Sequence, residues 1–171
     1  MRRTALLALV GLAVGCRNPL DLTSDDAPIR TDRTEYAVTH EGGALRVDIE
    51  FTYTNPTAGA VNVQACQVPD PPVLQKREDG KWVTAYAPVV LLCLGPPLVI
   101  PRGGSTRYAL HVRAFPAGSN AAPQWQAGSV AGTYRLLWAV HAGDGKNSAR
   151  DGGGPLVPVS QRVSNTFWLV E

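Results

Sequence analysis

Hydrophobic and polar residues alternate along much of this chain. Between residues 45 and 53 a hydrophobic side chain occupies every second position, with polar residues between: Leu45, Val47, Ile49, Phe51 and Tyr53. A period of two is typical of a β-strand that buries one face. Asn55, Pro56 and Gly59 follow directly and predict a turn.

The same pattern recurs in short segments towards the C-terminus. We expect further strands at residues 61–66, 74–77, 82–86, 89–93 and 98–100, and around Tyr108, Leu110 and Val112, around Tyr134, Leu136, Trp138 and Val140, and around Phe167 and Leu169. Asp79 and Gly80 stand between two of these segments and are a strong β-hairpin signal. No window shows a long helical period with caps. About eight short strands separated by Pro and Gly predict an all-β fold, an antiparallel β-sandwich.

Composition supports one folded domain. The chain has 171 residues, of which 44% are hydrophobic and 18% charged. That hydrophobic content argues against a disordered chain, and the length fits one domain or one domain with a tether. We place the sandwich at residues 33–171.

The N-terminus has the pattern of an export signal. Arg2 and Arg3 precede an apolar stretch at residues 4–14. Eleven residues are too few to span a hydrocarbon core, which needs about 20 in a helix. The segment is therefore a signal peptide rather than a membrane span.

Residues 12–16, Leu-Ala-Val-Gly-Cys, resemble a bacterial lipobox. The resemblance implies that residues 1–15 are removed and that the Cys16 thiol carries a diacylglycerol, which anchors the protein to a membrane. The alternative is an ordinary signal peptide that ends near a cysteine. Residues 16–32 are rich in Pro, Asp and Ser and predict a flexible tether. Arg17 after the lipid cysteine favours, by resemblance to enterobacterial sorting, the outer over the inner membrane; a periplasm-facing and a surface-exposed position both stay open.

Charge argues against a nucleic-acid partner. Of sixteen Lys and Arg, removal of Arg2 and Arg3 leaves fourteen, against fourteen Asp and Glu. The anchored chain would be near neutral and has no basic stripe. The partners we expect are the membrane, through the lipid, and an envelope protein or glycan.

Cys66 and Cys93 remain once Cys16 is assigned to the lipid. An even number of cysteines in an exported protein predicts one disulfide between them. Two buried free thiols are the alternative. Neither cysteine belongs to a Cys-x-x-Cys pair or stands in a His cluster, so we expect no metal site.

Several segments, in their order and spacing, resemble the bacterial immunoglobulin-like modules of uncharacterised envelope lipoproteins. They are residues 51–55, Val61, Cys66, and residues 79–82, 100–105, 132–136 and 164–167. A weaker likeness is to small β-sandwich intracellular proteinase inhibitors. Gly132-Thr133-Tyr134 is similar to a tyrosine corner, which implies that the Tyr134 hydroxyl bonds to nearby backbone. Leu136 stands where an antibody-type domain has its second cysteine, so the usual bridge between sheets is not expected.

Enzyme signatures are missing from the sequence. It contains no Gly-x-Ser-x-Gly, His-Glu-x-x-His or P-loop motif. His40, His111 and His141 are far apart and are expected at the surface or at strand ends. We therefore expect no catalytic residues and no cofactor.

Two long loops are the candidate binding segments. In residues 114–131, Trp125 lies between two glutamines and could stack on a sugar ring; alternatively it pins the loop to the sandwich. Residues 142–159 are rich in Gly and Asp, but their spacing does not match a calcium loop, and a solvated loop is expected. The other tryptophans, Trp82, Trp138 and Trp168, lie in strand patterns and are expected to pack.

These observations predict a membrane-anchored lipoprotein with a non-enzymatic immunoglobulin-like module for envelope binding or scaffolding. The alternative function is a proteinase inhibitor or a carbohydrate-binding protein that acts through residues 114–131 and 142–159.

Overall fold

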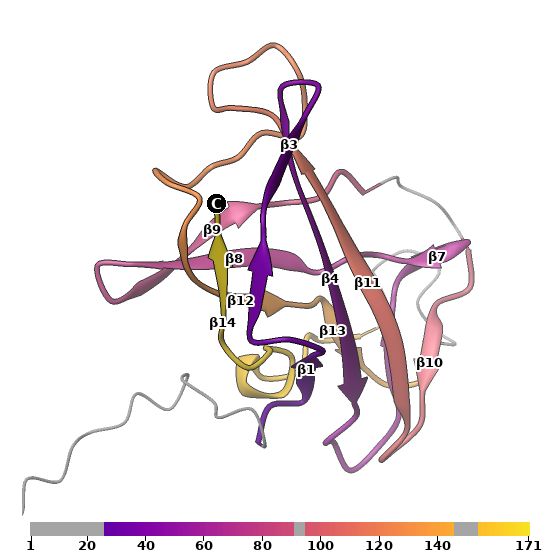
Figure 1. Ribbon diagram of the computed structural model, residues 1–171. Coiled ribbons are helices and arrows are strands. Elements are labelled where there is room, and N and C mark those ends of the chain that lie inside the picture. The colour runs from indigo at the N-terminus through magenta and orange to yellow at the C-terminus, as the bar shows by residue number, and fades with distance from the viewer. Residues whose placement is uncertain (1–25, 91–94, 146–153) are drawn as a thin grey trace, which may run out of the picture.

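The computed structural model describes residues 26–90, 95–145 and 154–171 (Figure 1). They form strands arranged mainly in antiparallel sheets, and no α-helix occurs among them. The prediction of an all-β fold is confirmed. The described residues contain fourteen strand segments instead of about eight. Two predicted strands divide between sheets, and four short strands, Ile29–Thr31, Glu35–Ala37, Thr39–Glu41 and Val68–Pro69, were not predicted. One short 3-10 helix, η1 (Val159–Gln161), precedes the last strand.

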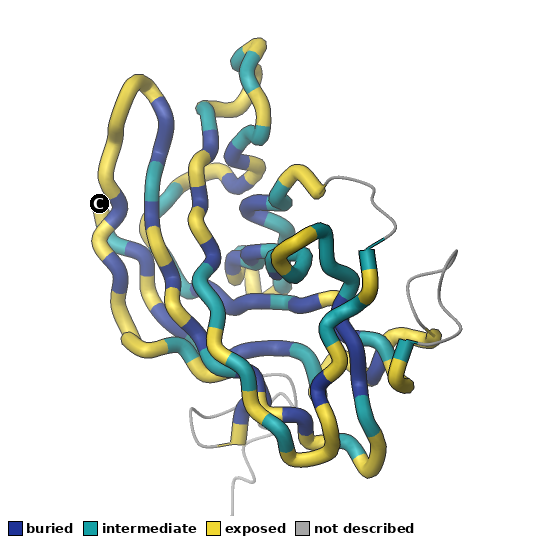
Figure 2. Tube along the Cα trace, turned by 90° about the vertical axis from the view of Figure 1, so that its right-hand side faces the viewer, coloured by how far each residue is buried: buried dark blue, intermediate teal, exposed yellow. Residues whose placement is uncertain are grey.

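A four-stranded sheet is built around the longest strand, which is the alternating segment of the sequence. Its members are β1 (Ile29–Thr31), β3 (Thr39–Glu41), β4 (Ala44–Thr54) and β11 (Ser105–Ala114). β4 is central, with antiparallel β11 along one edge and β1 and β3 sharing the other. The hydrophobic positions of β4 are buried; between them, Asp48 and Glu50 are exposed, and Arg46 and Thr52 are partly buried. Figure 2 shows such alternation of buried and less buried positions along the strands.

A five-stranded sheet supplies the second large layer. Its order is β2 (Glu35–Ala37), β14 (Phe167–Val170), β12 (Gly132–Leu137), β8 (Val73–Glu78) and β9 (Lys81–Tyr86). All of its pairings are antiparallel except β2 with β14. The predicted hairpin is confirmed at β8–β9, where Asp79 and Gly80 have φ of 48° and 76°. Two consecutive positive φ angles give a turn whose twist matches that of the strands.

Two smaller sheets account for the remaining strands. One contains β10 (Leu98–Ile100), β5 (Val61–Val63) and β13 (Val140–Ala142); the other pairs β6 (Ala65–Cys66) with β7 (Val68–Pro69).

The prediction of one strand over residues 61–66 is wrong, because the segment divides at Gln64 into β5 and β6. The face predicted from Tyr134 to Val140 also divides. The Val140 amide donates to the Trp138 carbonyl at 3.0 Å, and this tight turn takes the chain from β12 to β13 in another sheet. Of the segment predicted at 89–93, residues 89 and 90 lie in no strand and residues 91–93 are outside the described part.

The core is continuous across the sheets, and Trp138 is the largest of its fully buried side chains among the described residues. Its ring meets Phe51, Tyr53 and Tyr108 edge-on, with centroids 5.4–5.7 Å apart. Edge-to-face pairs of this kind add to the stabilisation that area burial provides. Trp138 was expected to pack, and this is confirmed.

The folded body begins before the boundary predicted at residue 33. Ile29 is fully buried, and its carbonyl accepts a hydrogen bond from the Asn165 amide at 3.1 Å. The Pro28 carbonyl accepts another from the Thr54 amide at 2.8 Å. Residues 29–31 therefore belong to the sheet, and Pro28 and Asp32 on either side of them are hydrogen-bonded to β4, so this part of the segment is not a tether. The signal peptide and residues 16–25 lie outside the described residues. Within the described part, no helix is long and apolar enough for a membrane span.

Candidate binding face

The outer face of the five-stranded sheet carries a line of side chains that we call the tryptophan row. It runs across five strands, from β2 to β9, and comprises Glu35, Trp168, Thr133, Arg77 and Trp82. Trp168 is paired with Glu35 on one side and with Thr133 on the other. Lys76 pairs with Tyr134, which sets Arg77 beside Thr133, and Arg77 pairs with Trp82. The row thus ends in a tryptophan at β9 and has a second one at β14, near its other end.

Trp168 is the exposed aromatic residue of the row. Its neighbours Phe167 and Leu169 are buried in the core, and strand alternation turns the side chain between them to the outside. Trp168 is 54% exposed. Its backbone is fixed, because its backbone amide donates to the Thr34 carbonyl at 2.8 Å and β14 is paired with a strand on each side. A large apolar ring is therefore held at the surface by regular backbone structure. The expectation that Trp168 packs in the interior is wrong.

Trp82 is half-buried and is fixed by an arginine. The guanidinium carbon of Arg135 lies 4.4 Å from the centroid of the Trp82 ring, a cation–π contact. Arg135 is itself buried, and its Nε donates to Gln75 Oε1 at 2.8 Å. These contacts restrict the rotamers that Trp82 can adopt.

Trp125, the predicted ligand contact, is only 6% exposed. Its ring centroid lies 5.9 Å from that of Tyr134, and its Nε1 donates to the Ser129 carbonyl at 3.4 Å. A ring covered in this way has no face open to a sugar. The burial of the ring favours the alternative, that Trp125 pins its loop to the body, over the contact with a ligand.

Tyr134 has the structural role expected for it. Its hydroxyl donates to the carbonyl of Val130, four residues upstream, and lies 3.4 Å from the Ser129 carbonyl. Lys76 Nζ donates to the same Ser129 carbonyl at 2.8 Å. The side chains of Lys76, Trp125 and Tyr134 therefore converge on this one carbonyl of the loop. Burial raises the pKa of Tyr134 above its ordinary value, because a phenolate would lose its hydration.

Of the three cysteines, one lies in the described part. Cys66 is a disulfide-bonded residue of β6. Cys93, the partner predicted for it, and Cys16, the predicted lipid site, lie outside the described residues. The Cys66–Cys93 pairing and the lipid attachment therefore stay predictions.

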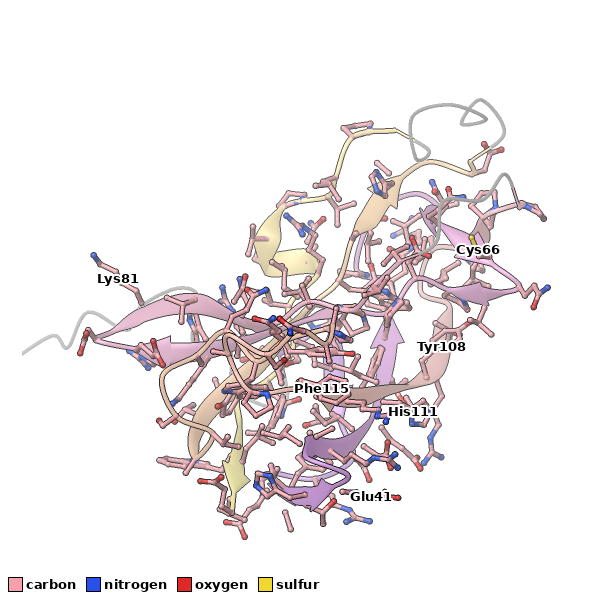
Figure 3. The ribbon with its side chains drawn as sticks, turned by 90° about the horizontal axis from the view of Figure 1, so that it is seen from above. Glu41, Cys66, Lys81, Tyr108, His111 and Phe115 are labelled. Carbon is pink, nitrogen blue, oxygen red and sulfur yellow. The ribbon has the colours of Figure 1, made fainter. Side chains whose placement is uncertain are left out.

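The three histidines are separate from one another, and each has a local contact. His111 Nδ1 lies 2.7 Å from Asp48 across β11 and β4, on the exposed face of the four-stranded sheet. His40 lies 3.5 Å from Glu171, and His141 Nδ1 lies 2.8 Å from the Gly154 carbonyl. Figure 3 shows His111 on β11 and Cys66 on a different element. In the described ranges, no three His, Cys, Asp or Glu side chains are grouped so as to hold a metal ion.

A hollow of about 690 Å³ lies beside β1, where the described chain begins. Its charged lining consists of Asp26, Arg30, Asp32 and Arg107. Arg107 forms an ion pair with Glu50 across β11 and β4. The two acidic and two basic side chains give the lining no net charge. The Arg107–Glu50 ion pair is exposed, and exposed ion pairs contribute little to stability.

Comparison with protein-family models, with curated proteins and with solved structures finds no match for this chain.

Proposed function

We propose that this chain is a non-enzymatic binding module of the bacterial cell envelope, anchored through a lipid on Cys16, and that the tryptophan row is its binding face. The observation that carries the proposal is the exposure of Trp168. Tryptophan is among the residues most enriched at binding surfaces, and here it sits on a strand bonded on both sides. A rigid support lowers the entropy that binding would cost.

An immunoglobulin-like sandwich and the lipid anchor form part of this proposal. The two large sheets contribute to one core, and the hydroxyl bond of Tyr134 to upstream backbone is the feature that a tyrosine corner has. Asp26 lies ten residue steps after Cys16, and an extended chain of that length reaches at most about 36 Å. The binding face would therefore work close to the membrane surface.

A binding role is favoured over a catalytic one by the arrangement of the titratable groups. Each histidine contacts a different neighbour: His111 lies beside Asp48, His141 beside the Gly154 carbonyl and His40 beside Glu171. The loop-based alternative loses its main support with Trp125, whose ring is covered. A disulfide from Cys66 to Cys93 would tie β6 to the segment before β10, and alkylation on reducing and non-reducing gels tests it.

The experiment compares binding to isolated envelope material by co-sedimentation. We expect Trp168→Ala to weaken binding about tenfold or more, because alanine removes the exposed ring. Val99→Ala is the matched control, since Val99 is also an exposed apolar strand residue, 43% exposed, but belongs to β10 in another sheet. Wild-type binding by Trp168→Ala, or no binding by the wild type, would overturn the proposal.

The anchor is tested separately by replacing Cys16. We expect Cys16→Ser to move the protein from the membrane fraction to the soluble fraction and to abolish incorporation of labelled fatty acid. A variant that still incorporates the label would contradict the lipid assignment.

A further inference from the structure

We infer that the tryptophan row binds a linear, uncharged glycan laid across the strands, with one sugar ring stacked on Trp168 and another on Trp82. This inference rests on the binding face proposed above and names the chemical class of its ligand.

The spacing of the two rings suits a chain of several sugars. Trp168 and Trp82 lie on β14 and β9, three inter-strand steps apart with β12 and β8 between them. At about 4.8 Å a step, their backbones are about 14 Å apart. A monosaccharide could reach one ring only, whereas a longer chain would reach both. Affinity should therefore depend on the length of the glycan.

The residues between the two tryptophans are polar. Thr133 carries a hydroxyl that donates and accepts, and Arg77 donates only. Glu35, beyond Trp168, accepts only. Sugars have apolar C–H faces and hydroxyl-bearing edges, so they need aromatic faces and hydrogen-bonding groups in alternation. The row offers that alternation on one sheet face.

Trp82 is prepared for stacking before a ligand arrives. Arg135 occupies one side of its ring at 4.4 Å and is oriented by Gln75. A ring that is already fixed loses little rotamer freedom on binding. Arg135 is a positioning residue in this arrangement, because it acts through Trp82.

Other classes of occupant fit the row less well. A polyanion such as nucleic acid would require a basic surface, but the row carries one arginine and one glutamate, whose charges cancel. A hydrophobic protein partner would require a continuous apolar patch, but Thr133 and Arg77 separate the two tryptophans. A neutral, hydroxyl-rich chain meets neither obstacle.

The test titrates the full-length chain, purified in a non-glycosidic detergent, with two probe series: β-1,4-linked oligomers of N-acetylglucosamine and of glucose, each from two to six units. Tryptophan fluorescence reports binding. We expect at least one series to bind, with affinity rising about tenfold or more from the shortest to the longest probe. Trp168→Ala and Trp82→Ala should each remove most of that gain. Thr133→Val should weaken the longest probe several-fold, and Val99→Ala should leave it unchanged.

Thermal unfolding of each variant shows whether the fold is intact. Trp168→Ala and Thr133→Val alter exposed or half-buried side chains, so the test stands even if Trp82→Ala does not fold. Binding that does not depend on length, or that survives Trp168→Ala, would overturn the inference. If neither series binds while Trp168→Ala abolishes envelope binding, the glycan inference fails and the proposed function stands. Self-association that depends on Trp168, measured by light scattering, would assign the row to a second copy of the chain instead.

Discussion

Trp125 and Trp168 occupy opposite environments. Trp125 lies in a long loop between two glutamines, yet it is 6% exposed and rests against Tyr134. Trp168 lies in an apolar strand, yet it is 54% exposed. A loop can fold back over the body and bury its aromatic residue, whereas a regular strand must turn alternate side chains outward. Regular structure therefore makes the more dependable display surface in this protein.

The two regions also differ in what holds them. The Trp125 loop is held by side chains that donate to its own backbone, chiefly from Lys76 and Tyr134. The tryptophan row is held by the strand ladders beneath it, and its side chains contribute little to those ladders. Substitutions should therefore affect stability in the first region and binding in the second.

The largest expected effect is on stability at Trp125. Trp125→Ala removes a buried indole and its contact with Tyr134, and should lower the free energy of unfolding by about 3–5 kcal/mol. Trp168→Ala should change it by no more than about 1 kcal/mol, because the ring is already half in water. Denaturant unfolding monitored by circular dichroism measures both. Equal losses in the two variants would contradict the contrast drawn between the two regions.

A smaller effect is expected from a matched pair of tyrosines. Tyr134→Phe removes a hydroxyl that bonds to Val130 and leaves this part-buried carbonyl without its donor, which should cost about 1–3 kcal/mol. The Tyr53 hydroxyl is buried and has no hydrogen-bond partner among the described residues, so Tyr53→Phe should be neutral or stabilising. Denaturant titration of both variants measures the change in the free energy of unfolding. If Tyr53→Phe lowered it as much as Tyr134→Phe, the loss in Tyr134→Phe could not be assigned to the hydrogen bond with Val130.

A more gradual effect is a loss of stability in alkali, about 1.4 kcal/mol per pH unit for each tyrosine that contributes. Burial raises the pKa of Tyr53 to about 12, and burial together with a hydrogen bond to Asp32 raises the pKa of Tyr36. The unfolded state loses these protons near pH 10 while the folded state keeps them. The contribution is therefore complete below pH 10 and, for Tyr53, is lost as the pH rises towards 12.

Unfolding curves recorded at pH 8, 9, 10 and 11 would measure this slope. In Tyr53→Phe the decline above pH 10 should be shallower, because one titrating group is gone. An unchanged slope in that variant would show that Tyr53 ionises no differently in the two states.

Much of the fold could be predicted where a local rule decides the conformation. Strict alternation located β4, and Asp79-Gly80 located the β8–β9 hairpin, because only a few turn types accept consecutive positive φ angles. The boundary at residue 33 was wrong because Ile29 owes its burial to β4 and to Asn165, which lies far away in the sequence. The continuous strands expected at 61–66 and 134–140 were wrong for a similar reason: pattern shows which side chains are buried but not in which sheet.

The candidate site shows the same division. The exposure of Trp168 could have been predicted from the sequence, because Phe167 and Leu169 on either side of it are apolar and strand alternation then turns Trp168 outward. It was not predicted, because the segment is apolar throughout and was interpreted as buried. The alignment of Trp168 with Thr133, Arg77 and Trp82 could not be predicted, because it depends on the register of four strands from distant parts of the chain.

By itself, the sequence determined the all-β character of this protein, its turns, and the inward and outward sides of each strand, since these follow from the two-residue period of a strand and from the backbone conformations that Asn, Asp, Gly and Pro accept. Tertiary structure alone decided which strands from distant parts of the chain became neighbours. Pairing between distant segments therefore buried Trp125, aligned the tryptophan row and extended the folded body to Ile29, because hydrogen-bonded ladders and core packing act between residues that are not close along the chain.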